Sequence, residues 1–161
     1  MKRFKKTMTL IELVMVIAVF AVAITPLLLL MSSLNQQVVQ ARLMNSAIVL
    51  GRDILEEILS KRYDENIIPP WSSHLGSDSG ESRNNYDDVD DFDGLSEGSV
   101  SGYPGFSRRI TVCYVDPDNK DLDTCRRDSQ QTNYKRVDVT VHHNLLGDVR
   151  FAVIVSSEYP Q

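Results

Sequence analysis

Histidine, cysteine and tryptophan are scarce in this chain of 161 residues, which contains three, two and one of them. The sequence has no second cysteine pair and no His-x-x-x-His spacing, so it lacks the ligand pattern of a structural zinc site. It also lacks a Gly-x-Ser-x-Gly motif and a P-loop. The adjacent His142 and His143 would point to opposite faces of a strand and could not chelate one ion. These absences argue against an enzyme, and we expect no cofactor, no metal and no small-molecule substrate.

Basic residues are also in the minority, with 17 Lys and Arg against 22 Asp and Glu and a formal net charge of −5. Four of the basic residues are crowded into positions 2–6, and without them the net charge of the rest is −9. A strongly acidic surface repels phosphate backbones and anionic lipid headgroups. We therefore expect no nucleic-acid partner, and other proteins or cations as the partners of the acidic part.

The longest apolar run extends from Leu13 to Met31, nineteen residues without a charge. As a helix it would measure about 28 Å, close to the roughly 30 Å of a bilayer's hydrocarbon core. The basic residues before it predict a cytoplasmic N-terminus and a translocated C-terminal part. A secretory signal peptide is the competing interpretation, but its apolar region is shorter and ends in a small-residue cleavage site.

Beyond the apolar run, the pattern becomes one-sided, which predicts a single helix from about Leu10 to about Tyr63 whose amphipathic part covers 32–63. Pro26 is expected to kink or loosen it, and Pro69 with Pro70 ends the helical pattern. Trp71, which follows, is expected to be buried at the end of the helix and sheet. The apolar stripe consists of Leu34, Val38, Ala41, Met44, Ile48, Gly51, Leu55 and Ile58.

Residues 72–105 hold six glycines and eight acidic residues against Arg83 alone, which predicts a polar loop. Within it, Tyr86, Val89, Phe92 and Leu95 recur every three residues. This spacing predicts a short turn or helix folded against the domain.

Three segments after Phe106 alternate apolar and polar residues, around 110–114, 136–143 and 149–155, and predict strands of an antiparallel sheet within 106–159. The amphipathic helix would cover its apolar face, giving an α+β fold. Cys113 and Cys125 are separated by eleven residues and, in an oxidising compartment, predict a disulfide. Acidic residues between them offer oxygens for calcium, although a solvated loop is the favoured interpretation. They are Asp116, Asp118, Asp121 and Asp123.

Glu12 is a carboxylate two residues inside the apolar segment, where a lone charge costs about 2.5–3.5 kcal/mol. From the residues alone, it could reach the cytoplasmic headgroups. The stretch TMTLIE around it resembles the signal of type IV prepilins, with Thr7 where that family usually has glycine. The resemblance implies that a prepilin peptidase removes the leader 1–7 between Thr7 and Met8 and methylates Met8. It also implies that Glu12 pairs with the new amine of a neighbouring subunit and sets the stagger between helices.

A second resemblance lies in GESRNNYDDVDDFDGLSEGSVSGYPGF, RRITVCYVD, VDVTVHHN and GDVRFAVIVSSEY, which look like minor pilins of the mannose-sensitive haemagglutinin pilus. It implies a type IV pilin-like fold, with the long helix on a sheet of three or four strands. Residues 8–31 would be the membrane and assembly half, and 32–161 a periplasmic head. The expected role is assembly of a pilus with other major and minor pilins, first in the inner membrane of a Gram-negative bacterium and then on the cell surface.

Two alternatives remain open at this stage. A minor pseudopilin of a type II secretion system would share the same physical features. An unprocessed, single-pass periplasmic binding or sensor protein would have an anchor that only resembles that of a prepilin.

Overall fold

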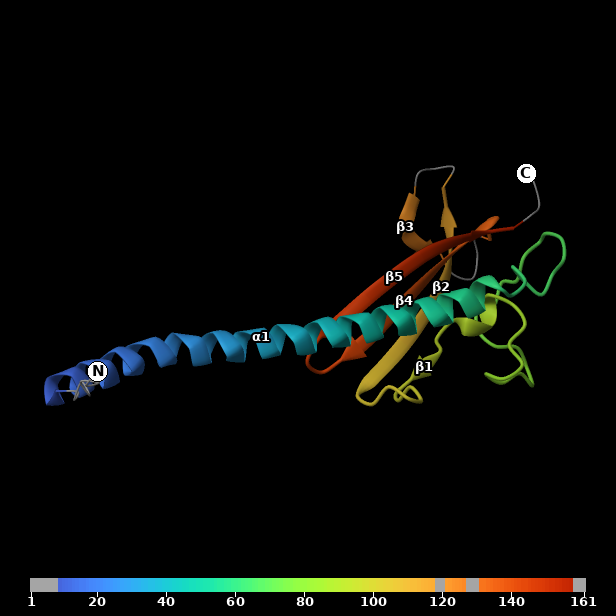
Figure 1. Cartoon of the computed structure of the whole chain (residues 1–161). Coiled ribbons are helices and arrows are strands. Elements are labelled where there is room, and N and C mark those ends of the chain that lie inside the picture. Colours follow the sequence, from blue (N-terminus) through green and yellow to red (C-terminus); the bar gives the residue numbers. More distant parts are fainter. Residues whose placement is uncertain (1–8, 118–120, 127–130, 158–161) are drawn as a thin grey trace, which may run out of the picture. The chain divides into compact units, whose positions relative to one another are not determined.

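The computed structural model describes residues 9–117, 121–126 and 131–157, which form one long helix, a short 3-10 turn and five strands. Residues up to Ala41 and residues from Arg42 onward form two compact units. We call the second unit the head (Figure 1). The α+β layout of an apolar N-terminal helix and a small antiparallel sheet is confirmed.

Helix α1 (Leu10–Leu59) begins where the sequence predicts and continues through Pro26 without a break in the helical backbone. It ends four residues before the predicted Tyr63. Its last turn tightens, since the Ser60 N–H donates to the carbonyls of both Glu56 and Glu57. The backbone of Arg62 then pairs with residues 87–89, so the chain leaves the helical conformation to bridge to the acidic loop.

The sheet has the strand order β1-β2-β4-β5, with β3 paired to another stretch of β2. Its three long strands are β2 (Phe106–Asp116), β4 (Tyr134–His143) and β5 (Gly147–Ser156), which confirm and extend the three predicted ones. All pairs are antiparallel. Gly147 opens β5 with φ +81°, a backbone conformation that glycine adopts without strain, and this explains its place in the β4–β5 turn.

The expected count of three or four strands was wrong, because two strands lie in segments predicted as loops. Strand β1 (Ser96–Glu97) has only two residues, and β3 (Asp121–Arg126) has Leu122 and Cys125 three positions apart among polar residues. Neither has the alternation that marks a half-buried strand. Their pairing with β2 is decided by the tertiary fold.

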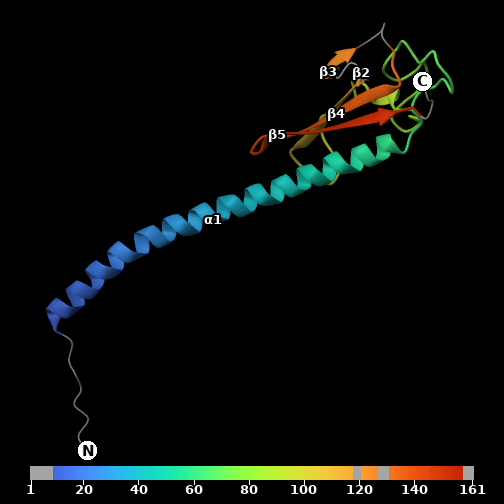
Figure 2. The same ribbon diagram turned by 90° about the horizontal axis from the view of Figure 1, so that it is seen from above.

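The core of the head forms between the last part of α1 and one face of the sheet, and Figures 1 and 2 show these elements side by side. The helix buries Ala47, Leu50, Gly51, Ile54 and Ile58, a set with the spacing of one helical face. The predicted stripe is confirmed at Gly51 and Ile58, which are buried, and at Leu55, which packs against the core. It is wrong at Met44 and Ile48, which are 40% and 44% exposed. The sheet contributes Phe106, Ile110, Val112, Val137, Val139 and Val141.

Residues 86–95 fold against this core as their three-residue period predicts. Val89 and Phe92 are fully buried, and Asp90–Phe92 form the 3-10 turn η1. The expectation for Trp71 is also confirmed, because its ring is buried against Tyr63 and its indole N–H donates to Asn133 Oδ1 at 2.8 Å. Part of the acidic loop and the segment after α1 therefore both pack against the head and contact each other through Arg62 and Asp88.

Candidate functional site

The exposed half of α1 is the first candidate site. Every residue from Leu10 to Arg42 is exposed, and the helix contains a stretch of mean hydropathy 2.9 that is long and apolar enough to cross a membrane. Large side chains such as Phe20, Leu29 and Met31 are more than half exposed. Exposure of such a large apolar surface to water is unfavourable, so lipid or other apolar helices are expected to cover it.

Glu12 lies in the first turn of α1, where a carboxylate interacts favourably with the free N–H groups of a helix N-terminus. Its side chain is exposed, and its backbone N–H donates to Thr9 Oγ1 at 3.4 Å. Thr7 and Met8, the predicted cleavage and methylation positions, and the rest of the leader lie outside the described residues. Thr25, next to Pro26, donates its hydroxyl to the carbonyl of Ala21 at 3.1 Å.

The predicted disulfide between Cys113 and Cys125 is present and joins β2 to β3. Cys113 is fully buried at the end of β2, where β3 begins to pair. Of the acidic residues considered for calcium, Asp116 forms an ion pair with Arg126 at 3.1 Å. Asp118 and the Asp121 side chain lie outside the described part.

The head also contains a buried charge cluster that the sequence interpretation missed, centred on Lys135 of β4. Its side chain is fully buried, and its Nζ donates to the carbonyl of Tyr63 at 2.7 Å. Two carboxylates pair with it, Asp64 Oδ2 at 2.8 Å and Asp90 Oδ1 at 2.5 Å. Burying an ammonium is costly unless such partners neutralise it and satisfy its donors. This cluster therefore ties β4 to the end of α1 and to η1.

Asp64 is the best satisfied member of the cluster. Besides Lys135, it accepts hydrogen bonds from the backbone N–H groups of Asn66 and Ser72 and from the Ser72 hydroxyl. The Tyr114 hydroxyl lies 3.3 Å from its Oδ2. Burial by itself would raise the pKa of Asp64, but these donors and the lysine together hold the pKa below its ordinary value.

Asp90 differs, because burial raises its pKa to about 8 against the opposing pull of Lys135. Asp88 is also buried, and burial with the nearby Asp91 charge raises its pKa to about 6. One lysine cannot neutralise three carboxylates at this depth. Burial therefore disfavours the charged form of Asp90, whereas the donors around Asp64 favour its charged form.

The pattern of β4 held a signal for Lys135. It shares its strand face with Val137, Val139 and Val141, so its position in the two-residue period already places it in the core. The acidic residues gave no such signal, because runs of aspartate are typical of a solvated loop.

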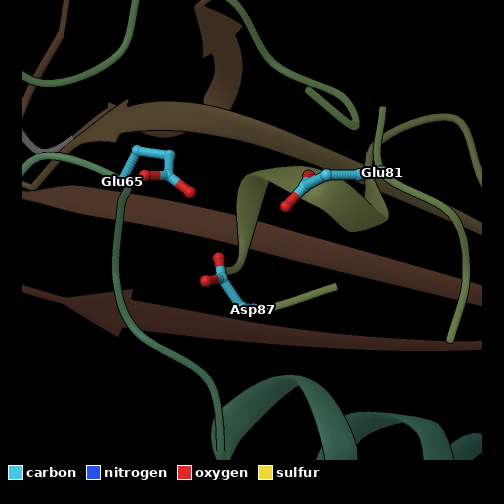
Figure 3. Close-up of side chains that lie close together, drawn as sticks. All are labelled: Glu65, Glu81 and Asp87. Atoms are coloured by element: carbon cyan, nitrogen blue, oxygen red, sulfur yellow. The ribbon is translucent and has the colours of Figure 1, made fainter. Parts of the chain in front are cut away.

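A second acidic group lies at the surface of the head, where Glu65, Glu81 and Asp87 have carboxylate oxygens within 4.8 Å of one another. Figure 3 shows the three side chains converging from separate segments of the chain, with strands of the sheet behind them. Arg62 pairs with Asp87 at 2.5 Å and with Glu65 at 3.6 Å. We call these three residues the acidic cluster; its one arginine leaves it with a surplus of negative charge.

Comparison with known proteins adds no relative to these observations: no family model, no curated protein and no solved structure matches the chain.

Proposed function

We propose that this protein is a minor pilin, a structural subunit that helps to initiate or cap a type IV pilus of the mannose-sensitive haemagglutinin type. Before assembly, its helix anchors it in the inner membrane with the head in the periplasm. The same helix then packs among the helices of other pilins at the cell surface.

The contrast between the exposed first part of α1 and its buried last part is the observation that supports this proposal most. The helix is exposed from Leu10 to Arg42, has a charge-free apolar run from Leu13 to Met31, and enters the core of the head from Ala47 onward. A plain membrane anchor needs only the first property and has no use for a carboxylate at position 12. An assembly subunit uses both, because the head is then carried on the element that packs with its neighbours.

Glu12 supplies the proposed register. If the prepilin peptidase cuts before Met8, a positively charged amine arises four residues from Glu12 in an apolar environment. A carboxylate of the adjacent subunit neutralises that amine, and any other stagger leaves two unmatched buried charges. Their pairing therefore selects one offset between helices, whatever its net contribution to stability.

The test of this register is the substitution Glu12→Ala in the native host, with Glu56→Ala as the matched control, since Glu56 is an exposed carboxylate on the same helix. We expect Glu12→Ala to lower the number of surface pili and the recovery of other pilins with this subunit by roughly tenfold or more, the effect of about 1.4 kcal/mol. Its amount in the membrane fraction should not change. Normal fibre numbers and recovery with Glu12→Ala would refute the assembly role.

Mass spectrometry of the mature protein distinguishes the proposal from a plain anchor. A methylated N-terminus at Met8 agrees with the pilin proposal, and a chain that keeps Met1 contradicts it. Deletion of the gene separates the two filament systems: loss of surface pili indicates a pilus subunit, whereas loss of exoprotein secretion with normal pili indicates a type II secretion pseudopilin.

A further inference from the structure

The outer face of the sheet, opposite α1, carries a row of residues that the proposed function does not use. Arg109 of β2 is paired in register with Thr140 of β4, and Thr140 with Arg150 of β5. Side chains alternate between the two faces of a strand, and the neighbours of these three along each strand point to the core. The three side chains therefore stand side by side on the face away from α1.

The spacing of this row suits an anionic group. With strands about 4.8 Å apart, the Cα atoms of Arg109 and Arg150 are about 10 Å from each other with the Thr140 hydroxyl between them. The row lines a hollow of about 430 Å³ that also includes His142 and Asp148. Two guanidinium groups on either side of a hydroxyl offer donors in the fork geometry that carboxylates accept.

The two arginines of this row, Arg109 and Arg150, form no close ion pair with described acidic residues of the head. Within the described residues, Arg109 has no ion pair, and Arg150, which is 79% exposed, is only 4.0 Å from Asp148. Among the residues that the structure describes, Asp148 is the sole acid lining the hollow, and it already lies 2.7 Å from Nδ1 of His142. Other arginines of the head are committed: Arg136 to Asp138 and the carbonyls of β3, Arg108 to Glu97.

Part of the outer face is covered. Toward the end of β2, Cys113 and Val115 are fully buried, and β3 with the disulfide lies beside them. The hollow at Arg109, Thr140 and Arg150 is open and carries two arginines of β2 and β5 against Asp148, in a chain whose net charge is −5.

The acidic cluster has the complementary charge and faces the other way. It adjoins η1, and Phe92 of η1 packs into the core from the α1 side of the sheet together with Val89, the residue before η1. Neighbouring carboxylates act on the cluster: a side-chain hydrogen bond with Asp91 raises the pKa of Glu81 to about 7, and the Asp87 charge raises the pKa of Glu65. A cation from outside would relieve both.

We propose that the row Arg109–Thr140–Arg150 docks the acidic cluster Glu65–Glu81–Asp87 of a second copy of this chain. The two patches lie on opposite sides of one head, so the contact is head-to-tail, and each copy keeps one free patch of either sign. A contact of this kind does not close on itself and can repeat. Salt weakens it, since both patches are exposed.

The experiment measures self-association of the full chain in detergent micelles by analytical ultracentrifugation, at about 0.1 M and about 1 M salt. We expect Arg109→Glu with Arg150→Glu to weaken association at the lower salt by about tenfold or more, and Glu65→Lys with Glu81→Lys to do the same. Placing all four substitutions in one chain should restore it, because the two patches exchange signs. Thermal unfolding verifies that each variant is folded.

Arg42→Glu with Arg52→Glu provides the matched control, because it reverses two exposed arginines of α1 and should leave the salt-sensitive association unchanged. Association that does not depend on salt, or that survives either reversal, overturns the proposal. Failure of the fourfold variant to restore it shows that the arginine row binds something other than this cluster. The same conclusion follows if the chain stays monomeric and inorganic phosphate alone binds the row.

This contact concerns the head alone and does not depend on Glu12 or on processing at Met8. Its failure would leave the proposed pilus function standing, and loss of that function would leave the contact testable in the purified protein.

Discussion

The ring of Phe151 in β5 lies against Gly51 of α1, so closely that a Cβ atom at position 51 would stand 2.2 Å from its Cε2 atom. Glycine inside a helix usually costs about 1 kcal/mol relative to alanine. Here the absence of a side chain is what allows the helix to approach the sheet. Close contact between the two elements outweighs the helical preference.

Gly51→Ala should therefore destabilise the head, although alanine favours helix. Overpacking costs typically about 1–3 kcal/mol, which exceeds the gain in helix propensity. The free energy of unfolding, followed by the fluorescence of the buried Trp71 during chemical denaturation, measures the effect. Adding Phe151→Leu should recover much of the loss, because it removes the atoms that the new methyl group meets; a single variant as stable as the original chain would contradict the close contact.

Lys135→Met tests the buried charge cluster. Removing one partner of a buried ion pair leaves an uncompensated carboxylate and typically costs about 3–5 kcal/mol. The cost should appear as a lower free energy of unfolding and faster hydrogen exchange at residues 60–75 and 88–92. Arg52→Met is the control, because its ion pair with Glu56 is exposed to solvent and contributes little to stability. Equal effects of the two substitutions would show that the cluster is not a tie between elements.

The stability of the head should fall as pH rises from about 4 to about 8. The pKa of Asp88 is raised to about 6 and that of Asp90 to about 8, so the folded state holds protons that the unfolded chain has already released near its ordinary value. The stability that these groups contribute is fully present at pH values below their pKa in the unfolded chain. It is lost as pH rises through their pKa in the folded state. Asp64, whose pKa is lowered, acts in the opposite sense below pH 4.

Denaturation midpoints at pH 5, about 7 and about 9 measure this slope. Asp90→Asn, which keeps the shape of the side chain without its titration, should flatten the upper half of the curve. The exposed His142, whose pKa Asp148 raises, contributes a slope of the same sign, so His142→Gln serves as the comparison. An unaltered pH profile in Asp90→Asn would rule out Asp90 as the source.

The disulfide should stabilise the head mainly by reducing the conformational entropy of the unfolded chain. Cys113 and Cys125 are twelve positions apart, and closing a loop of this length contributes typically about 2–4 kcal/mol. The double variant Cys113→Ser with Cys125→Ser should unfold at correspondingly lower denaturant. The strands β2, β4 and β5 should persist in its circular dichroism, because β3 pairs at the edge of β2. Loss of all sheet signal would show instead that the bond is required for the whole fold.

Much of the fold follows from local pattern. The apolar run predicts the exposed half of α1, and the two-residue period predicts strands β2, β4 and β5. The short turn between β4 and β5 favours their antiparallel pairing. The recurrence of Tyr86, Val89, Phe92 and Leu95 marks the segment that folds onto the core. Each of these signals is a repeat along the chain, so the residues themselves carry it.

The sequence alone could not predict which helix face is buried or which charged side chains pair with each other. The predicted stripe of the amphipathic helix included Gly51 but also the exposed Met44 and Ile48, and contact with Phe151 and the sheet selects the face that is buried. In the same way Asp64 and Asp90 are ordinary loop acids until Lys135 lies between them. The long elements and the apolar helix with its carboxylate could be predicted from the residues, because hydrophobic periodicity is local, whereas β1 and β3 lack that pattern. Tertiary structure decided which charges are buried and paired, because these groups come from distant parts of the chain and meet only in the folded head.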